Sequence, residues 1–196
     1  MHPTFLDSLD NHTLVITAGQ RLSRALADAH TRRQCARGVQ VWERPQILPW
    51  GAWLQARWEA SLATTDGARH LLLAPAQEHT LWERVIAESE HASALLQLAA
   101  TARVAQEAWR LLHERRLPLA AIAQAASDDA RVFAGWAQRF SAWCDGKGWL
   151  DSARLPDRLT QLIHAGGLTL PRRLLLAGFD ELSPQQAMLR LRSRIL

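Results

Sequence analysis

LLLAGFDELSPQQ, at residues 174–186, is the stretch from which we derive the expected fold. The four apolar residues 174–177 predict a short, fully buried strand, and Gly178 interrupts them. Ser183 and Pro184 predict the start of a helix, because serine caps helix N-termini and proline suits the first helical position. An acidic turn joins the strand to the helix. This order is typical of an open α/β sheet, in which ligands bind just beyond the strand ends.

The composition is that of an ordinary globular protein. The 196 residues suit one domain, or one domain with a large insertion, and 48% of them are hydrophobic. The net charge is +4, and nearly all of the positive charge is arginine, because Lys147 is the only lysine. Base composition of the gene explains most of this preference for arginine. Guanidinium groups also suit phosphate oxygens, so the charge is a modest sign of nucleic-acid binding.

Several classes of protein receive no support from the sequence. Cys35 and Cys144 stand in unrelated segments without metal-ligand spacing, and the histidines are scattered. There is no G-x-S-x-G elbow for nucleophilic catalysis, no secretory signal and no apolar run long enough to span a bilayer. We therefore expect a cytoplasmic protein with reduced thiols, without a metal site, a cofactor or a membrane partner.

The N-terminal part predicts two further strands, each followed by a helix. Thr13–Thr17 (TLVIT) is rich in β-forming residues and predicts the first strand, and residues 20–37 predict a helix. Residues 39–42 predict a second strand, and the proline-bracketed residues 44–49 predict an extended lead into a tryptophan-rich helix. The first helix is expected to face the sheet with Leu22, Ala25, Leu26 and Ala29.

Between residues 74 and 166 the sequence predicts helices and no strand. The expected helices cover residues 75–90, 92–115, a short segment after Pro118, a segment capped by Ser127, and residues 155–164. We therefore predict a helix-rich α/β fold, in which a large all-helical insertion interrupts a small parallel sheet of the P-loop type. The predicted segments are residues 1–66 and 171–196 for the α/β domain and 67–170 for the insertion.

The turn after the first strand lacks the residues of a phosphate-binding loop. A P-loop reads G-x-x-x-x-G-K-[ST], because backbone N–H groups, a lysine and a hydroxyl must meet phosphates and Mg²⁺. Residues 17–24 read TAGQRLSR, without the lysine or the second glycine, so we do not expect this chain alone to hydrolyse ATP. Asp180 and Glu181 could bind a metal ion, although polar side chains at a sheet edge are the simpler interpretation.

Three segments resemble motifs of superfamily 1 helicases of the UvrD/RecB type. LVITAGQRLSRAL looks like motif Ia, VWERPQILPWGAWLQARW lies where motif Ib does, and LLLAGFDELSPQQ looks like motif II. Together with RFSAWCDGKGWLD, their order is similar to the N-terminal region of AddB-type proteins of the RecB-family nuclease group. The resemblance covers nearly the whole chain. It implies a helicase 1A-like domain with a 1B-like insertion, in a protein of DNA repair and recombination.

The resemblance also shows where this chain departs from the helicase pattern. When the phenylalanine and the Ser-Pro pair of motif II are aligned, Ala177 and Gly178 take the places of its Asp-Glu pair, and Asp180 and Glu181 take those of its Gln-Asp pair. With Gln186, these are the positions of a degenerate motif II. The resemblance thus implies a helicase domain without its ATPase. In the family, exonuclease activity lies in a C-terminal PD-(D/E)xK domain, so we expect this chain to be an N-terminal fragment.

The expected function is non-catalytic binding of DNA, single-stranded by analogy with motif Ia. The candidate contacts, at a turn and helix start suited to anions and on the loop that follows, are Thr17, Gln20, Arg21, Arg24, Arg44 and Trp50. A solvated helix face explains these arginines equally well. Two alternatives stay open. One is an NTPase that uses Asp180 and Glu181 with a partner's phosphate loop, and the other is a module whose helical insertion docks on a helicase or nuclease subunit.

Overall fold

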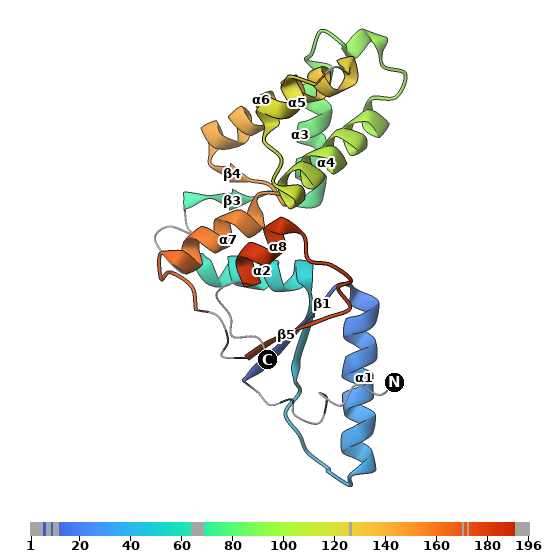
Figure 1. Ribbon diagram of the computed structural model, residues 1–196, viewed down its shortest axis with the longest axis vertical. Coiled ribbons are helices and arrows are strands. Elements are labelled where there is room, and N and C mark those ends of the chain that lie inside the picture. The colour runs from blue at the N-terminus through green and yellow to red at the C-terminus, as the bar shows by residue number, and fades with distance from the viewer. Residues whose placement is uncertain are drawn as a thin grey trace.

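The computed structural model describes residues 6, 9, 12–63, 69–125, 127–169, 171 and 173–190. Its main sheet has three parallel strands in the order β2-β1-β5 (Figure 1). The strands are β1 (Thr13–Thr17), β2 (Gln46–Pro49) and β5 (Arg173–Ala177). The prediction of a helix-rich α/β fold with a small parallel sheet is therefore confirmed at this coarse level.

Helices cover both faces of the sheet, as Figure 1 shows. Helix α1 (Gln20–Ala36) packs on one face against Val15 of β1. The other face carries Leu14 and Ile16 and is covered by the helices α2 (Trp50–Ser61), α7 (Leu155–His164) and α8 (Pro184–Arg190). Because neighbouring residues of a strand point to opposite faces, the apolar run of β1 supplies both cores, and all five of its residues are buried.

The structure corrects two predictions in the N-terminal part. The second strand lies at β2 and not at residues 39–42, where Val41 is 88% exposed. Tertiary packing decides this, since Ile47 of β2 is buried with the core under α1. On α1, Ala25 is exposed although it was expected to face the sheet. Ser23 is buried instead, because its hydroxyl donates to the carbonyl oxygen of Ile47 at 3.1 Å.

A helical part lies at the opposite end of the molecule from the sheet's helix α1 (Figure 1). It contains α3 (Pro75–Ala87), a 3-10 turn at Ala92–Ala94, α4 (Leu98–Arg115), α5 (Leu119–Ala123) and α6 (Asp128–Lys147). Its core is aromatic. The fully buried Trp82 ring stacks on Phe140 with centroids 4.2 Å apart and meets Trp109 edge-on at 6.2 Å. Phe140 of α6 is also fully buried in this core.

The expectation that residues 67–170 are all helical was wrong in one respect. The short strands β3 (Leu71–Leu72) and β4 (Trp149–Leu150) form a second, two-stranded parallel sheet. Strands of two residues have no periodicity, so the sequence could not predict them. Moreover, α7 packs into the same core as β1 and α2. The segment boundaries at 66 and 170 stay a prediction.

A buried polar cluster joins the helical part to α7. Asp151 is fully buried and accepts hydrogen bonds from the indole Nε1 of Trp109 at 3.0 Å and from the side chain of Arg154. Glu78 of α3 is 1% exposed and accepts from the Gln106 amide at 3.1 Å and from the backbone N–H of Ser152 at 3.0 Å. These bonds satisfy carboxylates that would otherwise be costly to bury.

Candidate nucleic-acid interface

The three strands of the main sheet end at the same edge. Thr17, the last residue of β1, lies in register with Pro49 of β2 and with Ala177 of β5. The N-terminus of α1, the N-terminus of α2 and the turn at residues 178–183 therefore meet at this carboxyl edge. The sequence placed Gln20, Arg21 and Trp50 on these elements, and the fold brings the elements together.

Thr17 is not presented to a ligand. Its side chain is fully buried, and its hydroxyl donates to the carbonyl oxygen of Gly19 at 3.0 Å. It therefore shapes the turn between β1 and α1. Gln20 and Arg21 follow this turn and are both exposed. The first turn of α1 contains no acidic residue, so nothing in that turn offsets the positive end of the helix dipole.

Gly178 is held against α1 in a conformation that favours glycine. Its φ is +73°, and a Cβ atom built on it would lie 2.3 Å from Cδ2 of Leu22. The preceding residue, Ala177, accepts a hydrogen bond from the backbone N–H of Ala18 at 3.0 Å. The two positions that align with the Asp-Glu pair of motif II thus serve strand pairing and close packing on α1.

The acids of the turn point into solvent. Asp180 and Glu181 are both exposed, and neither makes a hydrogen bond or ion pair with another described residue. Gln186 has a structural role, because it completes a capping box with Ser183. The Ser183 backbone N–H donates to Gln186 Oε1 at 2.9 Å, and the Gln186 N–H donates to Ser183 Oγ at 3.2 Å. The predicted helix start at Ser183 and Pro184 is confirmed.

Trp50 lies beside this turn at the start of α2. Its ring meets Phe179 edge-on at 6.4 Å and is tilted against Trp53 at 5.4 Å. Trp50 is half-buried, whereas Trp53 is 2% exposed. Of these two indoles, Trp50 is therefore the one that a base could reach at the sheet edge.

The structure places Arg24 and Arg44 in a neighbouring groove. This groove, of about 510 Å³, lies between α1 and β2. Both arginines are exposed and form no ion pair with another described residue, and Asp28 is the one acid that lines the groove. Arg21 and Arg24 are three residues apart on α1 and so lie on neighbouring turns of one face. Helix α1 therefore runs from the carboxyl edge of the sheet, where Arg21 lies, to the groove, which Arg24 lines.

The lining of this groove was missed in part by sequence reasoning. Asp28 and Thr31 of α1 and Gln46 of β2 also line it. The helical spacing of Arg24, Asp28 and Thr31 was visible in the sequence. The position of Gln46 was not, because residues 44–49 were expected to lead into a helix and not to pair in the sheet.

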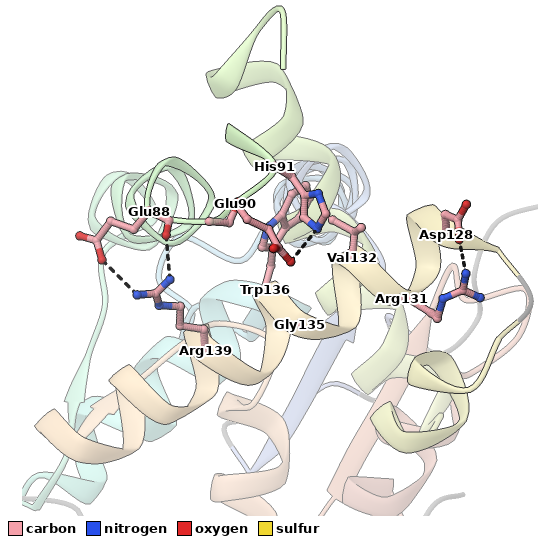
Figure 2. A pocket seen from close by; sticks show the side chains of 10 residues that line it. Glu88, Glu90, His91, Asp128, Arg131, Val132, Gly135, Trp136 and Arg139 are labelled. Carbon is pink, nitrogen blue, oxygen red and sulfur yellow. Dashed lines mark hydrogen bonds and ion pairs between the residues drawn. The ribbon is translucent and has the colours of Figure 1, made fainter. Parts of the chain in front are cut away.

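A second hollow, of about 770 Å³, lies in the helical part and was not predicted (Figure 2). Figure 2 shows Arg139 of α6 directed at the end of α3, where it donates to the carbonyl oxygen of Glu88 at 3.0 Å and approaches its carboxylate at 3.5 Å. Arg131 pairs with Asp128 at the other end. Because acids in the hollow neutralise these arginines, it suits a polyanion less well than α1 does.

Other kinds of site find no support in the described ranges. No three His, Cys, Asp or Glu side chains gather there in a way that could hold a metal ion. None of the helices described is both long and apolar enough to cross a lipid bilayer. Comparison with protein-family models and with curated proteins finds no match to this chain.

Proposed function

We propose that this chain is a non-catalytic, helicase-like domain that binds single-stranded DNA along α1 and the carboxyl edge of the main sheet. The observation that carries the proposal is the row of exposed cations Arg21, Arg24 and Arg44, none of which has an acidic partner among the described residues. The row begins at the carboxyl edge of the sheet, the edge at which Trp50 also lies. Cations that track a backbone next to an aromatic platform are the usual means of binding single strands.

The packing at Gly178 supports a role without ATP hydrolysis. An acid at this position would need space that Leu22 occupies, and Asp180 and Glu181 lie two and three residues further along an exposed turn. The turn after β1 also lacks a lysine. The resemblance to AddB-type proteins, in which the helicase-like region has lost its ATPase, agrees with this proposal. A parent protein of DNA repair and recombination with a separate nuclease domain is part of the same proposal.

A salt titration tests the proposal. Binding of a fluorescently labelled oligothymidine is measured by anisotropy for the intact chain and for the double variant Arg21→Ala/Arg24→Ala. If both arginines contact phosphates, the slope of log K against log salt concentration falls by about 1.4, at about 0.7 per phosphate of a single strand. The matched control is Arg103→Ala/Arg115→Ala, which removes two exposed arginines from α4.

The control variant loses the same number of positive charges, but it loses them from α4, outside the proposed interface. It should therefore keep the slope of the intact chain. Equal slopes for all three proteins would contradict contact at α1. The absence of any binding would instead favour the docking alternative. That alternative has one observation in its support, since Val104 and Leu111 of α4 are 70% and 42% exposed and lie two helical turns apart.

A further inference from the structure

An apolar groove, apart from the proposed DNA interface, lies between helix α3 and the β3–β4 pair and has a volume of about 410 Å³. Its floor is Leu73 and Leu81, which are 7% and 8% exposed and belong to the core of the helical part. Leu71 and Trp149 pair across the two strands, so their side chains lie on one face and form a wall. Leu71 is 58% exposed and Trp149 is half-buried. The α3 groove, as we call it, thus extends the apolar core to the surface.

The charge around the α3 groove is positive. Of the described residues that line it, Arg84 is the one that carries a charge. Its Nε donates to Glu88 at 2.9 Å, but its side chain is 69% exposed, and Glu88 is shared with Arg139 at 3.5 Å. Lys147 lies over the ring of Trp149, 5.3 Å from its centroid, and forms no ion pair with another described residue. Arg84, Arg139 and Lys147 therefore outweigh the negative charge of Glu88.

The polar groups at the rim of the groove are donors of hydrogen bonds. Oε1 of Gln77 already accepts from the backbone N–H of Ala74 at 2.9 Å, which leaves the amide nitrogen of Gln77 as a donor for a ligand. The guanidinium of Arg84 has donors only. Arg84 follows Gln77 by about two turns of α3, or roughly 10 Å along the helix axis. An apolar ligand that carries acceptors or negative charges on both sides fits this arrangement.

We propose that the α3 groove binds a segment of a partner protein in which acidic residues flank one aromatic side chain. The aromatic ring lies on Leu73 and Leu81 and against Trp149, where a pair of rings adds to the gain from apolar burial. The acidic residues lie by Arg84 and Lys147, and their carboxylates supply acceptors for the donors of the rim. The sign of the charge thus selects the partner, since a basic segment is repelled by Arg84 and Lys147.

A chain segment suits the α3 groove better than a small molecule does. Sites for small molecules bury about 70–90% of the surface of the ligand, whereas the wall at Leu71 is open to solvent. A segment needs to bury only one anchoring side chain, and the rest of it lies on the surface. The groove uses α3, β3 and β4, whereas the proposed DNA interface uses α1 and the edge of the main sheet. Binding at the α3 groove is therefore independent of the proposed binding of DNA.

An NMR titration of the ¹⁵N-labelled chain with the peptide DEDFDED, blocked at both ends, tests the proposal. We expect the amide signals of Leu71 and Leu81 and the indole signal of Trp149 to shift. The peptide DEDADED lacks the ring and should bind about tenfold to a hundredfold more weakly. The peptide KRKFKRK keeps the ring, reverses the charge and should also bind more weakly. No shift with DEDFDED, equal affinity for either control peptide, or the same shifts with oligothymidine would overturn the proposal.

Two variants locate the contact. Leu71→Glu puts an acid into the wall and should lower the affinity for DEDFDED at least tenfold, whereas Leu111→Glu, at an exposed leucine of α4, should leave it unchanged. Arg84→Ala should lower the affinity about two- to fivefold at low salt, the range of an exposed ion pair, and Arg103→Ala is its control. The dispersion of the NMR signals shows whether each variant is folded. A folded Leu71→Glu or Arg84→Ala variant that binds as tightly as its control would refute the proposal.

Discussion

The side chain of Leu22 fills the space into which a side chain at position 178 would project. A Cβ on Gly178 would lie 2.3 Å from Cδ2 of this leucine. The contact ties the first turn of α1 to the turn after β5, two segments far apart in the sequence. In the motif II alignment this is the place of the second acid, so the packing there bears on stability and on the proposed absence of ATP hydrolysis.

Gly178→Ala should therefore lower the free energy of unfolding by about 2–4 kcal/mol, because strain at a positive φ adds to overpacking. Urea denaturation measures this. Gly135→Ala is the matched control, since its Cβ would meet nothing within 4 Å, and it should stabilise α6 by about 0.5–1 kcal/mol. In a Leu22→Ala background the cost of Gly178→Ala should fall. An unchanged cost there would contradict the contact.

Trp50→Ala should weaken binding of oligothymidine by about 1–3 kcal/mol, the range of base stacking on an aromatic ring. Trp50→Phe keeps an aromatic face and should retain most of the affinity. Because Trp50 packs on Trp53 and Phe179, urea denaturation of each variant must accompany the anisotropy titration. Equal affinity of the alanine variant and the parent would remove Trp50 from the interface.

Glu78 should make stability depend on pH. Burial raises the pKa of Glu78. The hydrogen bond from the backbone N–H of Ser152 lowers the pKa and so offsets part of this rise. A carboxyl group with a raised folded-state pKa binds its proton more tightly in the folded state. Its stabilising contribution is therefore complete below the unfolded pKa of 4.5 and is lost as the pH rises through the folded pKa.

Glu78→Gln removes this titration and can keep both hydrogen bonds if the Gln106 amide turns over. The free energy of unfolding of the variant, relative to the parent, should thus rise between pH 4.5 and about pH 8, as followed by urea denaturation. Other groups that titrate in this interval cancel in the comparison. A difference between variant and parent that is the same at both pH values would show that Glu78 does not titrate in this window.

Asp151→Ala should cost about 3–5 kcal/mol, because it leaves the Arg154 guanidinium without its buried partner and the Trp109 indole without an acceptor. Asp145→Ala is the matched control. Asp145 also pairs with Arg154, at 2.7 Å, but its side chain is 65% exposed, so the cost should be about 0–1 kcal/mol. Similar losses in the two variants, measured by urea denaturation, would argue against the importance of burial.

Much of the fold could be predicted from short sequence patterns. The TLVIT run forms β1 as expected, and α1 begins at Gln20 and is followed by Gly38 with a φ of +72°. The positions of α6 and α7 were also predicted closely, although Ser127 makes no side-chain cap bond at the start of α6. In these elements apolar periodicity and turn residues agree, so local propensity and tertiary packing favour the same structure.

The candidate site could be predicted only in part. The sequence identified the arginines of α1 and the tryptophan at the start of α2, but it could not show that Thr17 is buried and bonded to Gly19. It also grouped Arg24 and Arg44 with residues of the sheet edge, whereas both line the groove beside β2. Exposure and neighbours depend on how elements pack, and residue type alone does not specify them.

The sequence by itself determined the elements that have strong local patterns: the central strand, the first helix, and the strand, glycine and Ser-Pro cap at residues 174–184. Tertiary structure alone decided which extended segment became β2, that β3 pairs with β4, and that Gly178 lies against Leu22. The physical reason is that a strand of two to four residues becomes stable only through hydrogen bonds and burial supplied by distant parts of the chain.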